Sequence, residues 1–145
     1  MLAVRKKEIR VFCPACRQPM IVLEIRNVEI DHCVACGGVW LDGGELELLL
    51  EEASNRDELM ATLSELVEEK RKKIRCPMCS KKLEKVRYGV ERNLILDKCP
   101  RNDGLWFERG ELEKALRMGQ FTKGKPIYDI LNEIFGDSSR DGSLD

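Results

Sequence analysis

A chain of 145 residues has room for one ordinary domain or for two very small ones. Its 43% hydrophobic and 35% charged residues indicate a globular protein, but only 6% of the residues are aromatic, which argues against a single large core. The formal net charge of −1 excludes a uniformly basic or acidic chain.

The amino-terminal residues have no apolar run behind their charges, and every apolar stretch of the chain is far shorter than a membrane span. We therefore expect no signal peptide, no membrane contact and a cytoplasmic location. In a reducing compartment cysteines serve as metal ligands more often than as disulfides. The odd count of seven cysteines also prevents complete pairing.

The chain contains an internal repeat. A Cys-Pro-x-Cys motif, an Arg-Asn pair followed by Asp-x-Cys, and a Gly-x-Trp…Gly-Glu-Leu motif each occur twice in the same order. Arg92 lies 66 residues after Arg26, whereas Cys76 lies 63 residues after Cys13. The second copy therefore has three extra residues, which we place within 87–90.

Each copy predicts the same local structure: a lead-in strand, a cysteine turn, a hairpin and a helix. In the first copy Arg26 and Asn27 are the expected hairpin turn. Asp42 can cap the helix and Glu45, three residues on, can reach back, whereas Glu108 is a poorer cap in the second copy. The expected strands are 9–12, 20–23 and 28–30 in the first copy, with a shorter lead-in at 74–75 in the second.

Beyond the first copy, Ser54-Asn55 predicts a break before a charged linking helix. An apolar stripe at helical spacing predicts that this helix covers residues 56–73. One continuous helix over 44–73 is the alternative. Near the end, Pro126 at a favoured first-turn position introduces a short helix, and the polar residues that follow are expected to be disordered.

The first copy contains two Cys-x2-Cys pairs separated by sixteen residues, a spacing typical of a four-cysteine zinc site. Each pair places two thiolates on one metal through a tight turn, and Zn²⁺ accepts four thiolates in a tetrahedron. A rubredoxin-like iron site also uses two such pairs, but there they lie further apart, so zinc is favoured. The expected ligands are Cys13, Cys16, Cys33 and Cys36.

The second copy is less regular because Asn102, a poor zinc ligand, stands in place of the fourth cysteine. Asp103, one residue later, offers a carboxylate that zinc accepts. A site with three cysteines and water, and a site without metal, remain the alternatives. The ligands that we expect here are Cys76, Cys79, Cys99 and Asp103, which would bring the chain to two Zn²⁺.

Two other residue types also invite a functional reading. Trp40 and Trp106 could stack on nucleic-acid bases, but in such small units they are expected to fill the core. His32, the only histidine, is expected to be exposed rather than a ligand, because its counterpart is Lys98.

The pattern Cys-Pro-x-Cys, then Asp-x-Cys-x-x-Cys-Gly-Gly-x-Trp-Leu-Asp-x-Gly-Glu-Leu, resembles the zinc-finger domains classed as transcription factor IIB-type zinc ribbons. The resemblance covers 13–50 closely, and 76–116 with the fourth ligand altered. It implies a β-hairpin zinc ribbon followed by a helix, and a role in contact with nucleic acid or the transcription machinery. Nothing in the chain corresponds to the cyclin-like repeats of the initiation factor itself.

We therefore expect a small α+β fold stabilised by metal, with two zinc ribbons each followed by a helix and joined by a charged linking helix. The expected divisions are 1–53 for the first ribbon and helix, 54–73 for the linking helix, 74–119 for the second ribbon and helix, 120–136 for the short helix, and 137–145 for the tail.

Charge is unevenly distributed along the chain. Residues 42–69 contain ten acidic side chains and one basic, whereas residues 70–87 contain nine basic and one acidic. The first copy also has a basic lead-in, and clustered cations attract phosphate backbones. Pairing of the acidic with the basic segment is the alternative. The candidate nucleic-acid contacts are Arg5, Lys6, Lys7, Arg10, Lys70, Arg71, Lys72, Lys73, Arg75, Lys81, Lys82, Lys85 and Arg87.

These patterns favour a non-enzymatic zinc-binding accessory factor whose basic ribbon edges contact nucleic acid or the transcription machinery. The alternative is a protein-interaction adaptor, in which the Leu/Met stripe of the linking helix pairs with a partner or with a second copy. The sequence has no phosphate-binding glycine loop and no nucleophile–base pair, so neither an enzyme nor a small-molecule substrate is expected.

Overall fold

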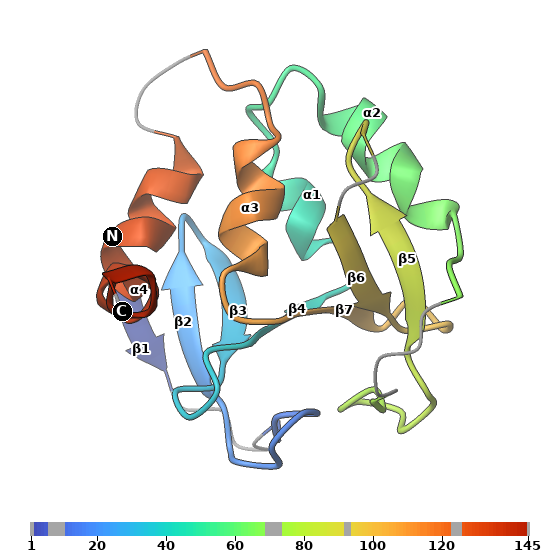
Figure 1. The fold of residues 1–145 in the computed structure, drawn as a ribbon, viewed down its shortest axis with the longest axis vertical. Helices are drawn as coiled ribbons and strands as arrows, with labels where there is room; N and C mark the ends of the chain where they lie inside the picture. Colours follow the sequence, from blue (N-terminus) through green and yellow to red (C-terminus); the bar gives the residue numbers. More distant parts are fainter. Residues whose placement is uncertain (1, 6–10, 69–73, 92–93, 123–125, 145) are drawn as a thin grey trace.

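The structure is a computed structural model that describes residues 2–5, 11–68, 74–91, 94–122 and 126–144. Within these residues the chain forms one antiparallel sheet of seven strands, with the helices on one of its faces (Figure 1). The strands are β1 (Leu2–Arg5), β2 (Ile21–Ile25), β3 (Val28–His32), β4 (Val39–Asp42), β5 (Glu84–Tyr88), β6 (Leu94–Lys98) and β7 (Gly104–Phe107). The helices are α1 (Glu45–Leu49), α2 (Arg56–Ala61), the 3₁₀ turn η1 (Thr62–Ser64), α3 (Glu111–Arg117) and α4 (Ile127–Leu144).

The two copies of the repeat meet at the centre of the sheet. The strand order is β1-β2-β3-β4-β7-β6-β5, so β4 of the first copy pairs with β7 of the second. Trp40 lies opposite Trp106, its own equivalent in the repeat. The copies are therefore related by a local two-fold axis between the tryptophans. The predicted α+β fold of two ribbons, each followed by a helix, is confirmed, and the direct pairing of β4 with β7 adds a contact between the copies that was not predicted.

The Gly-x-Trp motif builds this seam. A Cβ atom on Gly38 would lie 2.3 Å from the ring of Trp106, and one on Gly104 would lie 2.6 Å from the ring of Trp40. Each glycine thus leaves room for the tryptophan of the other copy. Both tryptophans are buried, so they fill the core as predicted and offer no stacking platform.

The hairpins follow the sequence closely. Arg26 and Asn27 form a two-residue turn, and both have positive φ (49° and 67°), as expected for the turn that matches the twist of paired strands. In the second copy the three extra residues fall in the corresponding turn, between Tyr88 and Leu94.

The Gly-Glu-Leu motif starts the helix in both copies. Gly44 adopts a left-handed conformation (φ 90°) that most side chains disfavour. The Glu45 carboxylate accepts the backbone N–H of Asp42 at 2.7 Å, as the capping pattern predicts. Asp42 itself does not cap the helix, because its carboxylate accepts the indole N–H of Trp40 at 2.9 Å. Glu111 and Glu108 repeat the reach-back contact at 2.9 Å.

The linking helix is shorter than predicted. It ends at Ser64, and residues 65–67 run extended along the edge of β5, where Leu66 pairs with Val86. The N–H of Val67 donates to the carbonyl of Lys85 at 2.9 Å, and the N–H of Arg87 donates to the carbonyl of Glu65 at 3.1 Å. These bonds cover the open edge of the sheet, which a continuing helix would leave unpaired. Residues 69–73 lie outside the described residues.

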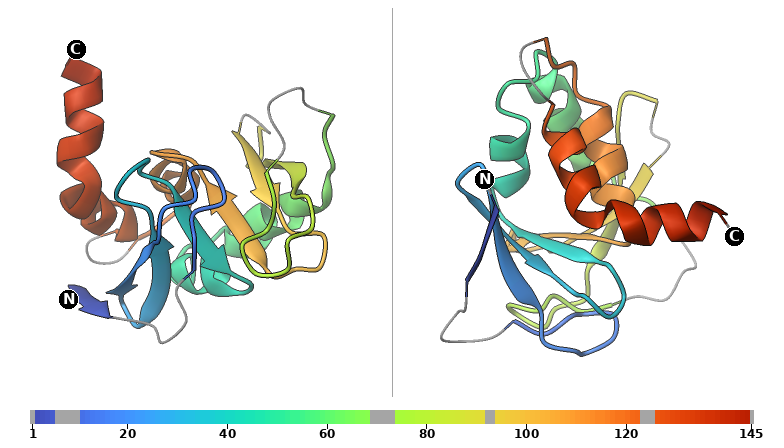
Figure 2. Two further views of the ribbon diagram at one scale, coloured as in Figure 1. Left: turned by 90° about the horizontal axis from the view of Figure 1, so that it is seen from below. Right: turned by 90° about the vertical axis from the view of Figure 1, so that its left-hand side faces the viewer.

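The predicted disordered tail over 137–145 is also wrong up to Leu144, because α4 continues through these residues. A helix nucleated by the docked residues Ile127 and Leu131 extends at little further cost per residue. Figure 2 shows that the carboxyl-terminal part of α4 projects away from the sheet. No helix in the described segments is long and apolar enough to cross a membrane.

The helices cross over between the copies. The segment that follows α1, namely α2 and η1, lies over β5, and α4, which follows α3, lies on the side of β1 and β2 (Figure 1). The apolar stripe predicted to pair with another chain is largely buried here between helices and sheet, and Leu66 is its exposed exception. Leu59 and Leu63 of the stripe lie in this core, together with four apolar residues that precede the linking helix, namely Leu46, Leu49, Leu50 and Ala53.

Candidate metal centres

The four cysteines of the first copy converge beneath the face of the sheet opposite the helices. The Sγ atoms of Cys13 and Cys36 are 3.6 Å apart, and those of Cys16 and Cys33 are 3.4 Å apart. Sulfurs bound tetrahedrally at about 2.3 Å from Zn²⁺ would lie about 3.8 Å from one another, whereas a disulfide would bring them to about 2 Å. The donor set and its spacing therefore fit Zn²⁺.

The local backbone shapes this donor set. Arg17, directly after the first pair, has a left-handed φ of 71°, and its N–H donates to the carbonyl of Cys13 at 2.9 Å. The resulting tight turn directs the N–H groups of Ala15 and Cys16 at the sulfur of Cys13, both at 3.3 Å. Hydrogen bonds of this kind stabilise a thiolate. Ser80, at φ 68°, repeats the same turn in the second copy.

The second cluster has three sulfurs and one carboxylate. The Sγ atoms of Cys79 and Cys99 are 3.6 Å apart, and the Sγ of Cys76 is 3.6 Å from an Asp103 carboxylate oxygen. The possible ligand atoms within each of the two clusters all lie within 4.8 Å of one another. The structure thus brings together all eight predicted ligands, and the second set also suits Zn²⁺, which accepts carboxylate oxygen with thiolates.

A shift in the turn explains why Asp103 takes the fourth place rather than Asn102. In the first copy the left-handed residue is Gly37 (φ 83°), and its N–H donates to the carbonyl of Cys33 at 2.8 Å. In the second copy the left-handed residue comes one position earlier, at Asn102 (φ 63°), and its N–H donates to the carbonyl of Cys99 at 3.0 Å. Asparagine tolerates this conformation better than most residues. The shorter turn moves Asp103 to the place of Cys36.

The thiols and the carboxylate differ in their expected charge before metal binds. Burial raises the pKa of the Cys76 thiol to about 12 and also raises the pKa of the Cys13 thiol. The hydrogen bond from Cys79 lowers the pKa of the Asp103 carboxyl below its ordinary value. The carboxylate is therefore ready to bind metal at neutral pH, while buried thiols must first lose a proton.

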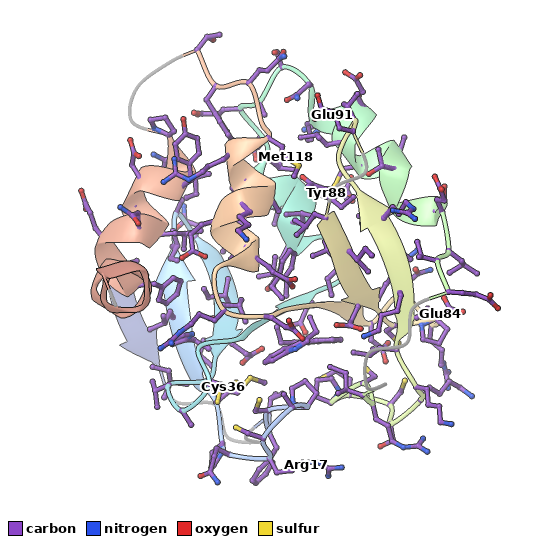
Figure 3. The ribbon with its side chains drawn as sticks, in the orientation of Figure 1. Arg17, Cys36, Glu84, Tyr88, Glu91 and Met118 are labelled. Carbon is purple, nitrogen blue, oxygen red and sulfur yellow. The ribbon has the colours of Figure 1, made fainter. Side chains whose placement is uncertain are left out.

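Both centres are part of the protein interior. One cluster of buried side chains joins both metal turns to both tryptophans; its members include Cys13, Cys33, Trp40, Cys76, Cys99 and Trp106. In Figure 3, Cys36 and Arg17 lie at the end of the molecule opposite Tyr88 and Met118, which lie among the helices. Four protein donors complete each tetrahedron and leave no open position for a substrate. Bound zinc would therefore hold this layer together.

The structure places the predicted basic residues in different surroundings. Arg75, Lys81 and Lys82 are exposed beside the second cysteine turn, and Arg87 lies 3.8 Å from the Glu65 carboxylate. Arg5 lies in β1. The other predicted contacts, namely Lys6, Lys7, Arg10 and Lys70 to Lys73, lie outside the described residues.

Lys85 was a wrong prediction. Its side chain is 4% exposed and is paired with the equally buried Asp97 carboxylate. Alternation along β5 directs it toward the metal side of the sheet, under the second cysteine turn, where it cannot reach a nucleic acid. No local signal in the sequence marks this burial, because Lys85 stands in a run of basic residues and its partner Asp97 lies on another strand.

Sequence reasoning missed two exposed cations on the metal side, Arg17 and Arg101. Each lies in a cysteine turn outside the main basic block. For Arg17 the available signal was the absence of acidic residues from segment 11–20, whereas Arg101 lies close to Asp97 and Asp103 and has no such signal. The helix layer is the opposite, because α1, α2 and their connection expose Glu47, Glu51, Glu52, Asp57 and Glu58.

His32 belongs to neither cluster of possible ligands in the described residues, and it is half-buried rather than exposed as expected. Its ring lies 4.5 Å from the ring of Phe135 in α4, and its Nδ1 lies 3.2 Å from the carbonyl oxygen of Gly38. Burial lowers the pKa of this imidazole. His32 thus joins the first metal turn to α4.

The family model described as transcription factor zinc-finger, a TFIIB-type zinc ribbon, matches residues 12–52 and 75–118. The two matches coincide with the two copies and include all eight clustered ligands. No curated protein and no solved structure matches the chain.

Proposed function

The chain belongs to the transcription factor zinc-finger family of TFIIB-type zinc ribbons, and from this premise we propose that it is a non-enzymatic zinc-binding accessory factor. Its metal-side face contacts nucleic acid or the transcription machinery, and its acidic helix layer is left for a protein partner. The seven thiols suit a reducing compartment such as the cytoplasm.

The observation that supports this proposal best is the separation of charge between the two faces of the sheet. The cysteine turns expose five cations in segments that contain almost no acid; these are Arg17, Arg75, Lys81, Lys82 and Arg101. Each loaded cluster carries a formal charge of about −2, which partly offsets these cations. We therefore expect binding to be weak, sensitive to salt and largely independent of base sequence.

The proposal is tested by titrating the zinc-loaded chain with fluorescent duplex and single-stranded DNA and RNA at several salt concentrations. The variant Lys81→Glu/Lys82→Glu should bind more weakly. If both lysines contact duplex phosphates, the slope of log affinity against log salt should fall by roughly 2. Lys114→Glu, an exposed residue of α3 in the helix layer, is the control and should leave binding almost unchanged. Absence of binding even at low salt would remove the nucleic-acid proposal.

A further inference from the structure

Two hollows flank the central seam, and the repeat relates them to each other. One is about 640 Å³ and the other about 170 Å³. Four lining positions correspond at the 66-residue offset of the repeat: Gly43 with Arg109, Gly44 with Gly110, Glu47 with Glu113, and His32 with Lys98. The two hollows are therefore the same groove formed twice. We call them the open groove and the closed groove.

Side chains of α4 close one side of the closed groove. Ile134 and Phe135 form one wall, and the Phe135 ring lies 4.5 Å from the ring of His32. Arg109 covers the floor, since its Nε lies 2.8 Å from where a Cβ on Gly37 would be. Within the described residues, the closed groove thus shows what this shape accepts: a helix that presents an aromatic side chain.

The open groove has neither an arginine in its floor nor a helix as long as α4 along its side. Gly43 stands where the closed groove has Arg109, and the carbonyl oxygen of Asn102 lies 2.6 Å from where a Cβ on Gly43 would be, so this position has no room for a side chain. Its outer wall comes from α2 and η1, which end after nine residues, whereas α4 has 18. That wall and the adjoining strand are mainly apolar, with Met60, Leu63 and Leu105 among the lining residues. Lys98 occupies the place of His32, and a lysine ammonium also binds the face of an aromatic ring.

We propose that the open groove binds an amphipathic helix of a partner protein, with an aromatic side chain inserted beside Lys98 as Phe135 is inserted beside His32. Helix-in-groove recognition of this kind depends on apolar anchors at helical spacing. Glu47 at the rim favours a basic residue next to the aromatic anchor. Apart from Asn102, which follows the exposed Arg101, the lining residues come from outside the cysteine turns, and binding of a partner helix there goes beyond the proposed nucleic-acid contact.

The chain supplies its own probe, a peptide of residues 126–144, which has the sequence of α4. We expect titration of this peptide into the zinc-loaded, ¹⁵N-labelled full chain to perturb the amide signals of Ala61, Ser64, Lys98 and Gly104. The matched peptide with Phe135→Ala should bind at least about tenfold more weakly, because it lacks the aromatic anchor.

A chain variant tests the location. Ala61 is exposed on α2 and lines the open groove, so Ala61→Glu places a charge in the groove with little risk to the fold. This variant should bind the peptide at least about tenfold more weakly, whereas Ser54→Glu, exposed outside the groove, should bind as the natural chain does. Three results would each overturn the proposal: no perturbation at millimolar peptide, unchanged binding by Ala61→Glu, or perturbation confined to His32 and Gly110, which would mean that the peptide only displaces α4.

Discussion

Asp103 and Cys36 occupy equivalent places around their metal centres, although they are not equivalent in the sequence. The left-handed residue before Asp103 shortens the turn by one position and brings the carboxylate within 3.6 Å of the Cys76 sulfur. A single residue with unusual backbone conformation therefore decides which side chain completes the donor set. The consequence is one site with four thiolates and a second site with three thiolates and one carboxylate.

Replacement of Asp103 tests this assignment. We expect Asp103→Ala to hold one Zn²⁺ firmly instead of two, because the second site loses its fourth donor, while Asp103→Cys should retain both. Metal analysis after dialysis gives the stoichiometry, and the Co²⁺ spectrum reports the number of thiolates per site. Asn102→Gly keeps the left-handed turn and is the control; two ions bound by Asp103→Ala would contradict the assignment.

Proton release provides an independent test of zinc loading. Since burial raises the pKa of thiols such as Cys76, they are protonated in the metal-free protein, whereas Asp103 is ionised. Zinc must displace thiol protons, so its affinity should fall as the pH falls. At about pH 6, loading should therefore release several protons per chain, those of the buried thiols Cys13 and Cys76 among them. Asp103→Ala should release fewer protons, because its second site no longer holds zinc firmly, as measured with an indicator in weak buffer.

At the level of strands and helices, the motifs that define the family act as structural devices. Gly-Glu-Leu starts α1 and α3 through a left-handed glycine, a reach-back carboxylate and a buried leucine. Gly-x-Trp joins β4 to β7, because the tryptophan of each copy packs against the glycine of the other. Both motifs therefore serve the packing of the two copies. Binding of partners depends instead on the exposed turns and grooves around them.

Substitution at Gly104 should weaken this seam. A Cβ atom there would lie 2.1 Å from the carbonyl oxygen of Leu41, so Gly104→Ala must push β4 and β7 apart. We expect a loss of about 1–3 kcal/mol in the free energy of unfolding, the usual cost of overpacking a core. Urea denaturation at saturating zinc measures it. Gly44→Asn, at a left-handed glycine with open space around it, is the control and should cost less; equal stability of Gly104→Ala and the natural chain would contradict the role of the seam.

At the scale of the whole molecule, the chain is a dimer-like assembly within one polypeptide. The pairing of Trp40 with its own equivalent makes the seam self-complementary, as in a two-fold symmetric dimer. The crossing of α2 and α4 to opposite copies strengthens the association. Stability is therefore shared between the copies rather than contained in each, which suits units too small to bury a core of their own.

A fragment of residues 1–68 tests this shared stability. Without the second copy, β4 has an unpaired edge and Trp40 loses the strand that covers it, so the zinc-loaded fragment should pair with itself through β4. Sedimentation equilibrium should then give twice the mass of the fragment. The same fragment with Gly38→Val, which blocks the partner tryptophan, should not form a folded dimer. A folded monomeric fragment would show that the first copy is independent.

The sequence by itself determined the features that depend on neighbours along the chain. The cysteine spacing predicted both metal clusters, the repeat predicted two equivalent units, and Arg26-Asn27 predicted the hairpin turn, because turns and ligand pairs are formed by residues close in sequence. Asp103 was also predicted as the fourth ligand, because it lies only one position after Asn102, which stands in place of the fourth cysteine.

Only the tertiary structure decided how the copies meet. The pairing of β4 with β7, the end of the linking helix at Ser64 and the burial of Lys85 all depend on contacts between residues far apart in the chain. Local propensity favours a longer helix and an exposed lysine at these positions. The sheet edge and the interior of the second copy reverse both preferences, because backbone hydrogen bonds and buried ion pairing outweigh weak local signals once the chain is folded.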